Sequence, residues 1–180
     1  MNEKVYNAGF DRLREAERLE RLEVNRVIKI LTENKDIKSV LDIGTGTAVF
    51  AEMFYKSGFE VAAIDLNPDM IEEAKKYAPQ VIYKVAPAEN IPFEDKSFDL
   101  AFMGLVFHEV DSYEKALSEA KRVSKKAIAI LEWDYVLEEV GPPIAHRVSP
   151  DIIKDLYDKL KFHSFEKIKL NTLVLYILEV

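Results

Sequence analysis

The segment VLDIGTGTAVF, residues 40–50, has the residue types and spacing of a turn that could bind a ligand. An apolar strand is expected to end near Asp42, glycines follow at Gly44 and Gly46, and a helical pattern begins directly afterwards. Glycine lets the backbone approach a ligand closely, and the start of a helix presents unpaired N–H groups to an anionic group. A tight turn without a ligand is the alternative, because two glycines alone carry little specificity.

A second acidic residue closes the next apolar run. Asp65 ends the run VAAID, nineteen residues after Gly46, where a doubly wound sheet places an acid beside the ribose of a nucleotide. A carboxylate there can accept hydrogen bonds from two hydroxyl groups, each worth about 1.5 to 3 kcal/mol. Asp65 could instead cap the following helix, but Asn67 before Pro68 already supplies a cap.

The residue three positions after Gly46 bears on which nucleotide is bound. Nicotinamide and flavin proteins have glycine or alanine there, in the pattern G-x-G-x-x-G/A, whereas this chain has Val49. An NAD-dependent oxidoreductase is therefore the weaker alternative.

Together these features resemble the class I S-adenosylmethionine-dependent methyltransferases. The resemblance rests on an Asp two residues before the first glycine, on G-x-G without the third glycine, and on Asp65 after the second strand. It extends through VAPAENIPFEDKSFDLAFMGLVFHEVDSYEKALSEAKRV, residues 85–123, which is similar to small-molecule methyltransferases of the ubiquinone and menaquinone biosynthesis type. It also includes GPPIAHRVSP, residues 141–150, so that it covers residues 38–180 almost without a gap.

The resemblance implies S-adenosylmethionine as the cofactor and assigns residues to its methionine and ribose parts. Gly44 and Gly46 would wrap the methionine part, which Asp42 would orient. Asp65 would accept the ribose hydroxyls, and Leu66 would pack on the adenine.

The resemblance also assigns the adenine loop and the end of the fourth strand. Ala88 and Glu89 would lie at the edge of the adenine, and Leu105 beside the reactive sulfonium. Relatives commonly have an acid where Pro87 stands, so Glu89 is the expected substitute partner. Two further departures, Ala48 in place of a third glycine and Ser124 to Lys126 in place of a Pro-Gly-Gly turn, should be tolerated.

His108 is the candidate general base, four residues after Gly104. Methyl transfer displaces a neutral thioether, so that proximity and alignment dominate and a base is needed only when the accepting atom carries a proton. The alternative is a histidine that braces the loop before Asp111.

The acceptor pocket has weaker candidates. Tyr6 and Phe10 resemble aromatic residues that fold over the cofactor in relatives, although core packing or disorder explains them equally well. Trp133, His146 and Arg147 could contact the acceptor, or could cap the core and lie in a surface loop.

The composition excludes several classes of function. The 180 residues are 48% hydrophobic and 32% charged, as in a single globular domain. The formal net charge of −7 repels phosphate backbones, so nucleic acid is not an expected substrate. The absence of cysteine excludes disulfides and thiolate chemistry, and with three scattered histidines no metal site is expected.

No apolar run is long enough to span a membrane, and the N-terminus lacks the pattern of a signal peptide. We therefore expect a cytoplasmic monomer or homodimer that methylates a small molecule and does not bind membranes. The single glutamine, with abundant Glu and Lys, indicates a thermophilic source. A catalytically silent module or regulatory subunit that binds S-adenosylmethionine remains the alternative from another class.

These residues require an α/β fold in which strands and helices alternate. We expect a Rossmann-like, doubly wound, seven-stranded sheet, mostly parallel, with helices on both faces. The expected strands lie near residues 38–43, 60–65, 81–85, 98–104, 127–132, 164–170 and 172–179. The last two are too close for a crossover and must form an antiparallel hairpin.

Local signals place the helices of this single domain, residues 1–180. Caps are expected at Asn67, at Asp111 with Glu114, and at Ser149 before Pro150. Residues 11–23 are highly charged and predict a solvated helix that continues to Leu31, so that residues 1–33 would form an arm or lid.

Overall fold

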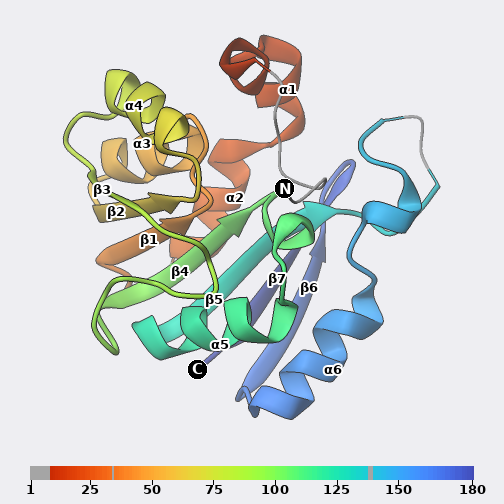
Figure 1. Cartoon of the computed structure of the whole chain (residues 1–180). Coiled ribbons are helices and arrows are strands. Elements are labelled where there is room, and N and C mark those ends of the chain that lie inside the picture. The colour runs from red at the N-terminus through yellow and green to blue at the C-terminus, as the bar shows by residue number, and fades with distance from the viewer. Residues whose placement is uncertain (1–8, 34, 138–139) are drawn as a thin grey trace.

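In the computed structural model of the chain, which describes residues 9–33, 35–137 and 140–180, one mixed sheet runs through the molecule (Figure 1). Its strands are β1 (Ser39–Ile43), β2 (Glu60–Asp65), β3 (Ile82–Val85), β4 (Phe98–Gly104), β5 (Ser124–Trp133), β6 (Ser164–Lys169) and β7 (Leu173–Glu179). Their spatial order is β3-β2-β1-β4-β5-β7-β6. The first five are parallel, and β7 pairs antiparallel with both β5 and β6. The predicted fold class and hairpin are confirmed.

Helices cover both faces of this sheet (Figure 1). One face packs against α2 (Val24–Thr32), α3 (Val49–Lys56) and α4 (Pro68–Tyr77), and the other against α5 (Tyr113–Val123) and α6 (Pro150–Leu160). The central strand β1 is buried at every residue. Strands buried on both sides have nearly continuous apolar sequences, which is why the runs were visible in the sequence. Among the described residues, no helix is long and apolar enough to cross a membrane.

Two of the predicted helix caps are confirmed, and one moves by a residue. The Asn67 side chain accepts a hydrogen bond from the Asp69 N–H at 2.9 Å, and Ser149 caps α6 in the same manner. At α5 the cap is Ser112 and not Asp111, because the Ser112 hydroxyl accepts the Lys115 N–H at 3.3 Å.

The N-terminal segment is not the continuous helix predicted from its charges. It forms a 3-10 turn η1 (Phe10–Arg14), the short helix α1 (Ala16–Arg21) and then α2, with breaks at Glu15 and at Glu23, whose φ is 46°. Leu13 and Leu22 are both buried. In a straight helix, residues nine apart point in opposite directions. The breaks therefore let both leucines pack against the body.

Candidate functional site

A cavity of about 270 Å³ lies at the carboxyl ends of β1, β2 and β4. Its walls include residues 44–47 after β1, residues 65–67 at the end of β2, residues 86–89 after β3 and residues 104–106 at the end of β4. The order β3-β2-β1-β4 reverses direction between β1 and β4. Open α/β sheets bind ligands at such a switch point, so the fold places the cavity where a nucleotide site is expected.

The glycine turn, residues 44–47, lines this cavity. Gly44 and Gly46 have φ angles of 70° and 53°, in the left-handed region that favours glycine. A Cβ on Gly44 would lie 2.3 Å from Cγ2 of Val106. Gly44 and Thr45 both donate their N–H groups to the carbonyl oxygen of Ile64, which fastens the turn to β2.

Ala48, the departure from the third glycine, is also left-handed, with φ 61°, and is fully buried. Its methyl group therefore packs in the core while its backbone is strained. The burial of the methyl group stabilises the fold and the left-handed backbone destabilises it, so the two effects offset each other and alanine is tolerated at this position.

Asp65 connects the glycine turn to the start of α4. One carboxylate oxygen accepts the Gly46 N–H at 2.8 Å, and the other accepts the Asn67 N–H at 2.9 Å. Burial raises the pKa of Asp65, and these backbone N–H groups oppose that shift. Each oxygen has a further lone pair, so the carboxylate can still accept two hydroxyl groups from a ligand. Leu66 beside it is 57% exposed and lines the cavity, where it offers an apolar surface.

Asp42 lies behind the turn and does not line the cavity. Its carboxylate accepts the Thr45 hydroxyl at 2.7 Å and the Ala51 N–H at 3.2 Å. Burial raises the pKa of Asp42 to about 7. In this structure Asp42 braces the loop between β1 and α3, and its predicted contact with a ligand stays a prediction.

The predicted adenine loop lines the cavity through Pro87, Ala88 and Glu89. One oxygen of Glu89 accepts the N–H groups of Asp111 and Ser112, at 2.8 and 3.2 Å. Glu89 thus joins this loop to the start of α5. The lining of the cavity therefore extends from the end of β2 to Asp111 before α5.

The N-terminal segment supplies a wall that the sequence did not identify residue by residue. Leu13, Arg18 and Leu22 line the cavity. Next to them, the guanidinium of Arg14 donates to the Thr47 carbonyl at 2.6 Å, pairs with Glu52 and lies 3.7 Å from the Tyr77 ring centroid. No local pattern singles these residues out, because a break at Glu15 separates Leu13 and Arg14 from Arg18 and Leu22.

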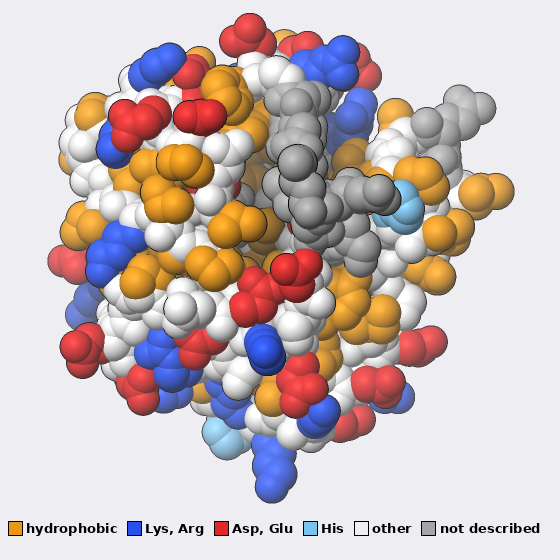
Figure 2. Space-filling model, in the orientation of Figure 1, with side chains coloured by type: hydrophobic (Ala, Val, Ile, Leu, Met, Phe, Trp, Pro, Cys, Tyr) orange, Lys and Arg blue, Asp and Glu red, His pale blue; other side chains and the backbone are white. Residues whose placement is uncertain are grey.

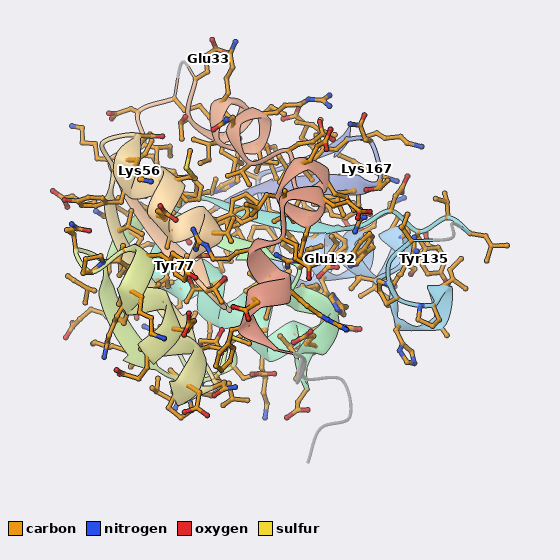
Figure 3. The ribbon with its side chains drawn as sticks, turned by 90° about the horizontal axis from the view of Figure 1, so that it is seen from above. Glu33, Lys56, Tyr77, Glu132, Tyr135 and Lys167 are labelled. Carbon is orange, nitrogen blue, oxygen red and sulfur yellow. The ribbon has the colours of Figure 1, made fainter. Side chains whose placement is uncertain are left out.

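His108, in the 3-10 turn η2 (Phe107–Glu109), contacts a carboxylate that was not among the predicted site residues. Its ring Nδ1 lies 2.9 and 3.0 Å from the two oxygens of Glu132, and its backbone N–H donates to one of them at 3.0 Å. Viewed from above, Glu132 lies near the middle of the molecule (Figure 3). His108 does not itself line the cavity, but its neighbour Glu109 does. A single acid within the apolar run of β5 was the available signal.

None of the three described acceptor candidates, Trp133, His146 and Arg147, lines the cavity. The guanidinium of Arg147 is buried and donates to the carbonyl groups of Asp134, Val136, Val140 and Pro142. Trp133 packs on the backbone at Gly141, and His146 is exposed in the 3-10 turn η3 (Ile144–His146). Tyr6 lies outside the described residues.

The loop after β5 carries exposed apolar side chains, which Figure 2 shows on the protruding lobe. They are Tyr135, Val136, Leu137, Val140 and Ile144. Arg147 therefore shapes a loop whose outer surface is apolar.

Charge and unsatisfied polar atoms indicate what the cavity can hold. Of the described lining residues, four are acidic (Asp65, Glu89, Glu109 and Asp111) and one, Arg18, is basic. This balance favours a positively charged ligand. The hydroxyl of Thr47, also in the wall, is buried and has no hydrogen-bond partner among the described residues. A ligand with sugar hydroxyls, a flat ring, a cationic centre and a hydrogen-bonding end fits these residues.

Comparison with known proteins agrees with this geometry. The family described as "Methyltransferase domain" matches residues 41–130. A malonyl-[acyl-carrier protein] O-methyltransferase of Hamiltonella defensa is 32% identical over 105 residues, which are 57% of this chain and 41% of that protein. A demethylmenaquinone methyltransferase of Paenarthrobacter aurescens is 32% identical over 100 residues, which are 54% of this chain and 40% of that protein. The matched region thus spans about two fifths of these relatives.

Among solved structures, a SAM-dependent methyltransferase of Aquifex aeolicus superposes with a TM-score of 0.83. The two chains are 24% identical, and the match covers 95% of this chain and 96% of that one. This likeness establishes the fold. With half of its sequence matched to the family, the chain belongs to the methyltransferase domain family.

Proposed function

We propose that this chain binds S-adenosylmethionine in the cavity at the β1–β4 switch point and transfers its methyl group to a small molecule. The observation that carries the proposal is Asp65, whose carboxylate holds the Gly46 turn and still has acceptor capacity toward the cavity. When bound, the cofactor would supply a methyl group on a cationic sulfur, which is able to leave as a neutral thioether.

The residues of the chain would bind and align the cofactor. Gly44 and Gly46 would lie against its methionine part, with the Thr47 hydroxyl as a further polar partner. Asp65 would accept the ribose hydroxyls, and Leu66 would cover the adenine. The acidic lining would favour the cationic sulfonium form over the neutral thioether product.

The N-terminal segment contributes to the walls of the site. The N-terminal residues Leu13, Arg18 and Leu22 line the cavity, so we propose residues 9–33, the described part of the predicted arm, as a lid that excludes water. The relatives named for malonyl-[acyl-carrier protein] and demethylmenaquinone act on different acceptors, and they support methylation without selecting a substrate. His108 is the proposed base for an acceptor that carries a proton.

Replacing Asp65 with alanine tests the proposal. We expect the affinity for S-adenosylhomocysteine, measured by calorimetry, to fall by at least about tenfold, because charged hydrogen bonds to the ribose would be lost. Asp155→Ala on the exposed surface of α6 is the matched control and should leave affinity unchanged. Equal affinities in the wild type and in a folded Asp65→Ala variant would refute the assignment.

A further inference from the structure

Arg14, in η1, joins the N-terminal segment to three parts of the body. Its guanidinium donates to the Thr47 carbonyl at 2.6 Å and pairs with Glu52 of α3. The same group lies 3.7 Å from the centroid of the Tyr77 ring of α4, as a cation–π contact. The side chains of Arg14 and Glu52 are 18% and 14% exposed, so this ion pair is better shielded from water than a surface pair. One cation thus connects η1 with the glycine turn and two helices.

The Thr47 carbonyl depends on Arg14 because the helix behind it does not use this oxygen. In a continuing helix the Thr47 carbonyl would accept the N–H of Ala51, four residues later. That N–H instead donates to the carboxylate of Asp42 at 3.2 Å. Thr47 is buried, and a buried carbonyl without a hydrogen bond is costly. Arg14 therefore supplies a hydrogen bond that the glycine turn in the cavity wall needs.

Residues 10–22 bury few apolar side chains that would hold them in place. Within this range only Leu13 and Leu22 are buried, and α1 buries no residue. Figure 1 shows α1 standing above the edge of the sheet. A helix of six residues is unstable alone, so α1 should form only while the segment is docked. Leu13 lies against the glycine turn, because a Cβ built on Gly46 would be 3.4 Å from its Cδ1.

We propose that Arg14 is a positioning residue for the cavity, which couples the docking of residues 10–22 to the conformation of the glycine turn. The inference rests on the proposed function, because the ligand whose release it controls is the S-adenosyl cofactor or its product. When Arg14 is lost, the segment undocks more often and the turn loses the hydrogen bond on Thr47. A ligand in the cavity and Arg14 stabilise the same docked arrangement.

Amide hydrogen exchange followed by NMR tests this coupling without any ligand. The Leu19 and Leu22 N–H groups bond to carbonyl groups within the segment, so their exchange reports its undocking. The Gly46 N–H, which donates to Asp65, reports on the glycine turn. In Arg14→Met all three amides should exchange about tenfold faster, because the contacts of a charged group are lost. Exchange of the central strand β5 should not change, because the body stays folded.

Arg21→Met is the matched control. Arg21 pairs with Glu17 within α1, so the variant removes the same charge from the same segment without touching the glycine turn. Its exchange rates should stay within about twofold of those of the wild type. Arg14→Lys keeps the charge but not the forked guanidinium, and should restore part of the protection. Glu52→Gln weakens one contact of Arg14 and should act in the same direction as Arg14→Met, so it decides the outcome if Arg14→Met does not fold.

Binding of S-adenosylhomocysteine tests the consequence for the cavity. Its dissociation rate constant, measured by surface plasmon resonance, should rise by about tenfold in Arg14→Met, because the ligand leaves when the segment undocks. The affinity should fall by a smaller factor, about threefold. In the wild type, saturating ligand should slow the exchange of the Leu19 and Leu22 amides, because the coupling is reciprocal. Arg21→Met should release the ligand as the wild type does.

The possible results separate the role of Arg14 from the proposed function. Wild-type exchange rates in Arg14→Met, or an equal increase in Arg21→Met, would overturn the coupling. Faster exchange with unchanged ligand dissociation would show that Arg14 only fastens the segment, and would overturn its role at the cavity. A wild type that does not bind S-adenosylhomocysteine would refute the proposed function, and exchange in the ligand-free chain would still decide whether Arg14 couples the segment to the turn.

Discussion

Replacing Asp42 with asparagine should remove a pH dependence from the stability of this chain. The carboxyl is 2% exposed, and burial raises its pKa from 3.8 to about 7. Between these two values the folded chain holds a proton that the unfolded chain has released. The contribution of Asp42 to the free energy of unfolding is therefore complete below its pKa in the unfolded chain. It is lost as the pH rises through its pKa in the folded chain.

The size of the effect follows from the two pKa values. One pKa unit corresponds to about 1.4 kcal/mol, so the wild type should lose about 2 to 3 kcal/mol of unfolding free energy from this group between about pH 5 and pH 8. Asparagine can accept the same two hydrogen bonds, from Thr45 and Ala51, without a charge. The Asp42→Asn variant should therefore not show this decrease in unfolding free energy.

Urea unfolding of both proteins at the two pH values measures the difference directly, and other titrating groups cancel in the comparison. The wild type should weaken more than Asp42→Asn by the stated amount. Parallel pH dependences in the two proteins would show that the carboxylate ionises in the folded chain as easily as in the unfolded one, and would refute the reasoning.

Three further predictions concern the turn and the loop. Gly44→Ala should lower the free energy of unfolding by about 2 to 4 kcal/mol, because alanine would be strained at this φ and its Cβ would contact Val106. Val106→Ala should restore part of this loss in a double-mutant cycle measured by urea unfolding. Ala48→Gly should change stability by no more than about 1 kcal/mol, because relief of backbone strain offsets a lost buried methyl and added chain entropy; a larger change would contradict this balance. Arg147→Met should speed proteolysis within residues 134–147 while leaving the affinity for S-adenosylhomocysteine unchanged, and a loss of affinity would place Arg147 in the binding site.

The strands and the cofactor loops were predictable because their signals are local. Buried parallel strands form short apolar runs, and Gly44, Gly46 and Asp65 stand at the carboxyl ends of such runs. Since the carboxyl ends of parallel strands meet at one edge, residues distant in sequence could be assigned to one site.

The features that escaped prediction depend on contacts between distant segments. The local sequence does not show that Glu15 and Glu23 interrupt the N-terminal helix. The breaks depend on tertiary packing, because they allow Leu13 and Leu22 to be buried against the body of the protein. The pairing of His108 with Glu132 joins the turn after β4 to the end of β5, 24 residues later in the sequence. The sequence suggested that Arg147 could contact an acceptor, but its guanidinium donates hydrogen bonds to carbonyl groups of its own loop.

Calorimetric titration of the wild-type chain with S-adenosylmethionine, S-adenosylhomocysteine and NAD, in parallel, tests the central claim most directly. The account predicts binding of the first two with affinities on the order of micromolar, and no binding of NAD. Binding of NAD, or no heat with any of the three, would contradict the assignment of this cavity to S-adenosylmethionine.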